Sequence, residues 1–195
     1  MAVTVSGGCM TNANAPDAAP AAESSAGPAT VDPAVAAEWA RAGWSGTPTQ
    51  VQDPDSGVSA QLLGEPGTPK SNPGPDGTTK LSYVAPKGPA GVTTLFVVNR
   101  KPGLQIANLQ LEAESTAKGI QGRVASIAPV RIAGRPGLDV RIETGSGASL
   151  VIILRRSVLV DDSHIAVLSA TGSSADERSI TQAYEFVSGS LRIPH

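Results

Sequence analysis

Apolar residues in this chain recur mainly with the spacing of β-strands. Residues 91–100 are rich in β-branched and aromatic side chains and too apolar for a strand exposed on both faces, so we expect a central strand there. Four more strands are predicted at residues 124–132, 138–144, 149–159 and 164–171. The turns between these four contain Gly, Pro, Asp or Ser, which predicts antiparallel neighbours in a meander.

The beginning of the folded part is less regular. A helix is predicted to start at Asp32-Pro33, with Asp32 as its N-cap, and to end at Gly43. Residues 57–62 alternate as a short strand, and residues 79–84 alternate again after stretches rich in Gly and Pro. We expect these two strands to pair as a hairpin with a long turn.

Two later segments carry the period of an amphipathic helix. The stripe of the first, in residues 106–118, consists of Ile106, Leu109, Ala113 and Ala117. The second is predicted to begin with a capping box from Ser174 to Glu177. Its stripe consists of Ile180, Ala183, Tyr184, Val187 and Leu191, with Phe186 beside it. We expect this last helix to close over the sheet.

These elements predict one α+β domain on an N-terminal tether. Strands joined by local turns, with few helices that do not alternate regularly with them, favour a central antiparallel β-sheet flanked by helices. We expect a single domain over residues 33–195, with its core at about residues 50–193. Residues 10–32 are rich in Ala, Pro, Ser and Asn and contain almost no large apolar side chain, so a disordered linker is predicted there.

Charge and composition argue against nucleic acid as a partner. Lys and Arg total 15 against 17 Asp and Glu, and the chain has two residues each of Trp, Tyr and Phe. Such a chain has neither a strong basic field nor an aromatic stacking platform. The single cysteine excludes an internal disulfide and a site with several cysteine ligands. No stretch is long and apolar enough for a membrane-spanning helix.

The cysteine has a context of its own. Cys9 follows Val5-Ser6-Gly7-Gly8, and small residues before a cysteine are typical of the end of a bacterial lipoprotein signal. Ser6 stands where that motif usually has Leu, and eight residues precede the cysteine, so residues 1–9 are interpreted as a truncated signal with Cys9 as the lipidation site. A lipid there would anchor an extracytoplasmic domain to the cell membrane. The alternative is an exposed thiol in a disordered tail.

An enzyme would need a nucleophile, a base and an orienting group that converge. His164 is the one histidine before the C-terminal residue, and Asp161, Asp162 and Ser163 directly precede it. We interpret these three as a turn in which Asp and Ser serve the backbone, with neighbouring side chains that point in diverging directions. A hydrolase that uses His164, or a metal site formed with Asp161 and Asp162, is the alternative. We predict no catalytic, metal or cofactor-binding residues.

Two other patterns have a structural interpretation. The glycine-rich residues 134–137 and 145–147 lack the strand-to-helix context and the lysine of a phosphate loop, so hairpin turns are predicted. Five arginines lie on predicted strands: Arg131, Arg135, Arg141, Arg155 and Arg156. Asp139 and Glu143 are interspersed with them, which favours a solvated outer face over an anion-binding site.

Several turn motifs, and the order of the elements, resemble a known family. The motifs are Gly57-Val58-Ser59, Pro66-Gly67-Thr68-Pro69, Val130-Arg131-Ile132-Ala133-Gly134-Arg135-Pro136-Gly137 and Glu185-Phe186-Val187-Ser188-Gly189-Ser190-Leu191. In these the chain resembles actinobacterial lipoproteins with the PsbP/Mog1-like fold, such as the LpqN group, over about residues 50–193. The resemblance implies an α/β/α sandwich and a role as an accessory or adaptor protein of envelope or membrane assemblies. It provides no catalytic residue.

From the linker, Cys9 and the missing catalytic set we expect a non-enzymatic, lipid-anchored domain. Its partner is expected to be another envelope or membrane protein, with the chain acting as an adaptor or accessory subunit. The alternative is a carrier of a lipid or other small apolar ligand between the sheet and the helices. That role needs an apolar cavity of roughly 300 Å³ or more beneath the last helix.

Overall fold

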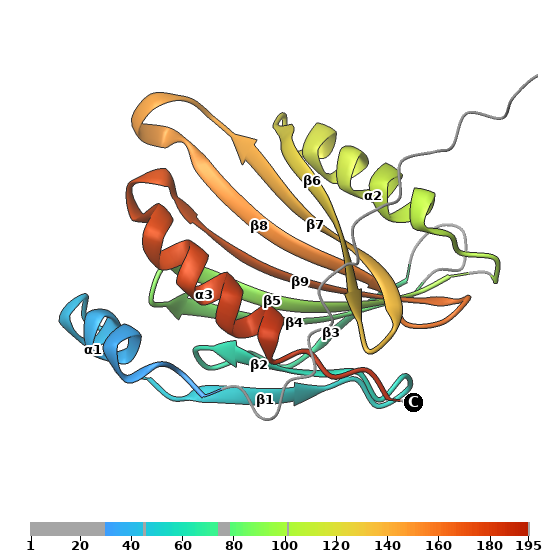
Figure 1. Cartoon of the computed structure of the whole chain (residues 1–195), viewed down its shortest axis with the longest axis horizontal. Helices are drawn as coiled ribbons and strands as arrows, with labels where there is room; N and C mark the ends of the chain where they lie inside the picture. Colours follow the sequence, from blue (N-terminus) through green and yellow to red (C-terminus); the bar gives the residue numbers. More distant parts are fainter. Residues whose placement is uncertain (1–29, 45, 74–78, 101, 195) are drawn as a thin grey trace, which may run out of the picture.

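The computed structural model describes residues 30–44, 46–73, 79–100 and 102–194. Its centre is a seven-stranded antiparallel sheet in the order β3-β4-β5-β9-β8-β7-β6. The strands are β3 (Lys70–Pro73), β4 (Thr79–Gly88), β5 (Gly91–Asn99), β6 (Arg123–Ile132), β7 (Arg135–Thr144), β8 (Val151–Leu159) and β9 (His164–Ser173). The α+β prediction is confirmed, as is the central place of residues 91–99, because β5 lies between β4 and β9 (Figure 1).

The described α-helices lie on both faces of this sheet: α1 (Pro33–Arg41), α2 (Ile106–Gly119) and α3 (Glu177–Gly189). Side chains alternate along β8, so that Ile153 packs with the apolar face of α2, whereas Ile152 and Leu154 pack with α3. Helix α2 covers β6, β7 and β8 on one face, and α3 covers β8 and β9 on the opposite face (Figure 1). The predicted layer of sheet between helices is therefore present.

A second, two-stranded sheet lies on the α3 side. It consists of β1 (Pro48–Gln52) and β2 (Ser59–Leu63), paired antiparallel. Leu62 of β2 is fully buried, in one apolar cluster with Leu95 and Leu168 of the main sheet. The predicted hairpin of residues 57–62 with residues 79–84 is wrong, because β2 pairs with β1 while β4 pairs with β3 and β5.

The two strands missed by the pattern are polar. The sequence of β1 is PTQVQ, in which Val51 is the buried residue, and all four residues of β3, KSNP, are exposed. Neither carries the apolar alternation from which a strand is predicted.

The turn between β6 and β7 is also shorter than predicted. Ala133 and Gly134, with φ of 49° and 75°, form a two-residue turn, and residues 135–137 belong to β7.

The start and the apolar face of α3 differ from the prediction. Residues 174–176 form a 3₁₀ turn capped by Ser173, and Asp176 makes no side-chain capping bond to α3, so the predicted capping box does not form. Phe186 is buried, whereas Tyr184 is only partly buried. The reason is α1, whose Trp39 packs edge-on against Phe186 with ring centroids 6.5 Å apart and so widens the buried face of α3.

Other predictions concern the helices and the tether. Asp32 caps α1 as predicted, accepting a hydrogen bond from the N–H of Ala34 at 2.7 Å. In α2 the predicted stripe is buried except for Ile106, which is 43% exposed.

Among the described residues, no helix is long and apolar enough to cross a membrane. Residues 1–9 with Cys9, and the linker up to residue 29, lie outside the described ranges.

Candidate functional site

The turn that leads into β9 is held by the Asp161 carboxylate. Its Oδ1 accepts backbone N–H bonds of 2.7 Å from Ser163 and from His164, and its Oδ2 lies 2.8 Å from Nδ1 of the His164 ring. Asp161 thus serves the backbone, as predicted. The prediction that these side chains diverge is wrong, because the carboxylate meets the imidazole as well.

The environment of Asp161 favours its ionised form. Burial raises the pKa of this carboxyl, but hydrogen bonds from Ser163 and His164 outweigh burial and lower the pKa below its ordinary value. A carboxylate can only accept, so the Nδ1 of a neutral His164 carries the ring proton in this contact. The other nitrogen, Nε2, is then left as an acceptor.

His164 also lines a pocket of about 130 Å³ on the α3 side of the sheet. The other residues around this pocket are Asp53, Pro54, Asp55, Ser71, Leu81, Val97 and Asn99. Strand pairing brings the last four together with His164: Ser71 lies opposite Leu81, Leu81 opposite Val97, and Asn99 opposite His164. The loop between β1 and β2 contributes residues 53–55. We call this hollow the His164 pocket.

Asp53 is the buried acid of the His164 pocket. It is 3% exposed, and its Oδ2 accepts hydrogen bonds from the backbone N–H of Ser56 at 2.7 Å and from the Ser56 hydroxyl at 2.6 Å. Its charge acts on the neighbouring Tyr83, whose pKa is raised by burial and further by Asp53. The Tyr83 hydroxyl donates to the carbonyl oxygen of Gln52 at 2.5 Å, which joins this loop to β4.

A hydroxyl nucleophile is not coupled to His164 in the described residues. Ser71 borders the same pocket but makes no hydrogen bond to the imidazole there, and the Ser163 hydroxyl donates to Asp162 at 2.9 Å. Within the same residues, no group of three or more His, Cys, Asp or Glu side chains is placed to hold a metal ion. The absence of an enzymatic activity stays a prediction.

The arginines of the meander do not form one solvated face. Arg155 is 5% exposed, faces α2 and forms an ion pair with Glu112, and burial lowers its pKa to about 10. Arg156 points to the opposite face and binds both oxygens of Asp139 at 2.7 Å. Arg141 binds Glu143 and also Glu177 of α3. The prediction of a shared outer face is wrong, because alternate residues of β8 enter different layers.

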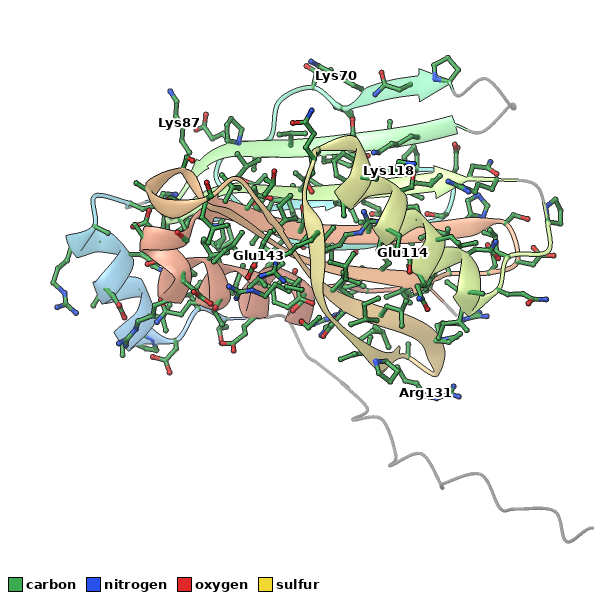
Figure 2. The ribbon with its side chains drawn as sticks, turned by 90° about the horizontal axis from the view of Figure 1, so that it is seen from above. Lys70, Lys87, Glu114, Lys118, Arg131 and Glu143 are labelled. Atoms are coloured by element: carbon green, nitrogen blue, oxygen red, sulfur yellow. The ribbon has the colours of Figure 1, made fainter. Side chains whose placement is uncertain are left out.

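A second candidate site lies at the β6 edge of the sheet, beside α2 (Figures 1 and 2). Five large apolar side chains of the described chain are exposed, and four of them belong to residues 106–127: Ile106, Leu111, Ile120 and Ile127. Leu111 is 62% exposed, the highest value of the five, and is two positions from the buried Leu109. It therefore points away from the sheet.

A shallow hollow of about 490 Å³ lies between α2 and the start of β6. Its lining consists of Glu114, Ala117, Lys118, Gln121, Gly122, Arg123 and Val124. A further hollow of about 340 Å³ shares residues 121–123 and extends toward Glu143 and Leu150. Figure 2 shows Glu114 and Lys118 on α2 above the sheet. We call the four exposed apolar residues together with the first hollow the α2–β6 surface.

The sequence pattern pointed to His164 but not to the other residues of the His164 pocket or to the α2–β6 surface. Asp53 and Ser71 are far from His164 along the chain, and they lie at or beside the two strands that were not predicted. The α2–β6 surface did leave a signal. Leu111 is apolar at a position outside the buried stripe of its own helix.

No protein-family model and no curated protein matches the chain. The chain is similar in structure to LpqN. That solved structure is described as LpqN involved in cell envelope biogenesis of Mycobacterium tuberculosis. The TM-score is 0.42 at 13% sequence identity, over 78% of this chain and 87% of LpqN. LpqN belongs to the group that the sequence motifs resemble, and at this identity no site residue is transferred.

Proposed function

We propose that this chain is a non-enzymatic adaptor domain, anchored to the cell membrane by a lipid on Cys9, that binds another envelope protein through the α2–β6 surface. The observation that carries the proposal is that four of the five exposed large apolar side chains of the described residues lie on α2, on the turn after it or on β6. Such a group beside a hollow with polar walls is typical of a protein interface. Leu111 is the expected anchor, with Glu114 and Lys118 in the polar rim.

The edge of β6 favours docking of side chains over the addition of a strand. The two-residue turn makes Ile132 and Arg135 a hydrogen-bonded pair, so Arg131, Pro129 and Ile127 turn their backbone groups outward. Pro129 has no N–H, which interrupts this outward row. We therefore expect the partner to pack onto Leu111 and Ile127, and not to extend the sheet.

The membrane address rests on the sequence around Cys9. Small residues precede the cysteine, and the predicted linker of residues 10–32 follows it, as expected for a domain held away from a membrane. Each buried methylene of an acyl chain adds about 0.8 kcal/mol to membrane affinity, so dual acylation gives stable anchoring.

Metabolic labelling tests the anchor. The chain is expressed in an actinobacterial host behind an intact lipoprotein signal and fed an alkyne fatty acid. Wild type should take up the label and sediment with membranes, whereas Cys9→Ser should stay unlabelled. A wild-type chain without label would contradict the lipid anchor. It would not affect the proposed interface, which the crosslinking experiment tests separately.

Site-specific crosslinking tests the interface. A photoreactive residue at position 111 should give a reproducible protein adduct in membranes, whereas the same residue at Val84, exposed on β4, should not. The captured protein, once purified, should bind Leu111→Asp at least ten times more weakly than wild type, with Val84→Asp unchanged. Equal weakening by both variants, or no reproducible adduct at 111, would refute the proposed interface.

A carrier of an apolar ligand has less support. The pockets bordered by α3 residues measure about 170 Å³, beside Trp39 and Phe186, and about 0 Å³, beside Ala183. A drug-sized or larger ligand needs roughly 300 Å³ or more. The apolar residues beneath α3 pack against one another and against the sheet instead.

A further inference from the structure

We propose that the His164 pocket binds a primary alkylammonium group, of the kind that ends a lysine side chain or a free diamine. This site lies on the α3 side of the sheet, whereas the α2–β6 surface lies around α2 on the other side. The inference is therefore independent of the proposed function.

The polar groups around the pocket are suited to accept hydrogen bonds. Asp53 and Asp55 bring carboxylates, Asn99 an amide oxygen and Ser71 a hydroxyl, and the described lining includes no Lys or Arg. An ammonium group has three donors and no acceptor. Acceptors that converge without a cation of the protein are the complement of such a group, and charge assistance strengthens each bond to a carboxylate.

Asp53 is the group that points most directly to a ligand. Its side chain belongs to a residue that is 97% buried, and both bonds from Ser56 reach the same oxygen, Oδ2. In the described part of the chain Oδ1 has no hydrogen-bond partner, and Asp53 borders the pocket. An ammonium donor in the pocket could bond to Oδ1, and its charge would strengthen that bond to the carboxylate.

His164 adds a further acceptor to the lining of the pocket. Asp161 binds Nδ1, so Nε2 is the ring nitrogen that accepts a hydrogen bond whenever the imidazole is neutral. The ring is also held in place, since its own backbone N–H is bonded to the same carboxylate. We therefore expect the ammonium to lie between Asp53 and His164.

The floor of the pocket favours an organic cation over a bare metal ion. Val97 is 4% exposed and Leu81 packs against the same apolar cluster, so the floor between the polar walls is hydrocarbon. Methylene groups next to an ammonium would contact it, as the stem of a lysine does on apolar surfaces. A volume of about 130 Å³ accommodates an ammonium with a few carbons.

A titration of the full chain followed by ¹H–¹⁵N NMR tests the site. n-Pentylammonium chloride should shift the amide signals of Asp53, Ser71, Asn99 and His164 and saturate in the millimolar range. 1-Pentanol, which has the same length and no charge, should bind at least ten times more weakly. Cadaverine and N-acetyl-lysine methylamide then distinguish the two sources of the ammonium. Tighter binding of cadaverine indicates a free diamine, and tighter binding of N-acetyl-lysine methylamide indicates a lysine side chain.

Matched variants assign the binding to Asp53. Asp53→Asn should weaken pentylammonium at least ten-fold, whereas Asp162→Asn, which removes the same charge from the exposed turn outside the pocket, should weaken it less than two-fold. If Asp53→Asn fails to fold, Asp55→Asn at the exposed rim should still weaken binding. Equal effects of Asp53→Asn and Asp162→Asn, equal binding of pentanol, or tighter binding of calcium chloride at the same amides would overturn the proposal.

Discussion

Replacing Glu112 with Gln should destabilise the fold, because Arg155 would lose its charged partner in a nearly dry site. Arg155 is 5% exposed beneath α2, where it forms an ion pair with Glu112. It also donates to Thr116 of α2 and to Ser157 of its own strand, both at 3.0 Å. These neutral hydroxyls cannot replace the negative charge of Glu112.

The pKa of Arg155 gives the scale of the effect. Burial lowers it from 12.5 to about 10, so the charged guanidinium is roughly 3 kcal/mol less favourable here than in water. Removing one partner of a buried ion pair typically costs about 3 to 5 kcal/mol. Because the Glu112 side chain keeps 21% of its exposure and Gln can still accept a hydrogen bond, we expect a loss of about 2 to 3 kcal/mol for Glu112→Gln.

Urea unfolding measured by tryptophan fluorescence checks this value. Glu114→Gln is the matched control, because Glu114 lies exposed on the same helix and bonds only to Gln110 there, so its cost should stay within about 0.5 kcal/mol. The double variant Glu112→Leu with Arg155→Met should return to within about 1 kcal/mol of wild type, since it removes both charges. If Glu112→Gln lowers the free energy of unfolding no more than Glu114→Gln does, the charge of Glu112 does not stabilise the buried Arg155.

Two further predictions concern α1 and the turn before β9. Trp39→Ala should lower the free energy of unfolding by about 3 to 5 kcal/mol in the same assay, because Trp39 is fully buried between Trp44 and Phe186; a loss below about 1 kcal/mol would mean that α1 is not part of the cooperative core. Asp161→Asn should lower the melting temperature at pH 6, and the difference from wild type should shrink toward pH 3. The folded pKa of Asp161 is lowered from 3.8, so its contribution is present above that value and is lost as pH falls through the folded pKa. A difference that does not change with pH would contradict this assignment.

Local patterns were sufficient for the elements whose signals lie within one stretch of chain. The apolar run of β5 and the stripe of α2 predicted a strand and a helix that the structure contains. The turn residues predicted the antiparallel order of β6, β7, β8 and β9, although the β6–β7 turn is shorter than predicted. Periodicity and turn chemistry act between near neighbours, so they can be read without the rest of the fold. His164 was identified as the histidine to examine for the same reason, since its acidic neighbours directly precede it.

Only the tertiary structure decided how distant segments meet. Pairing of β2 with β1 depends on burial of Leu62 against the main sheet, and the polar strands β1 and β3 have little apolar pattern of their own. Burial of Phe186 requires Trp39 of α1, which lies at the other end of the chain. Asp53 and His164 come to line one pocket through the same long-range packing, and a local pattern does not encode which distant surfaces will exclude water together.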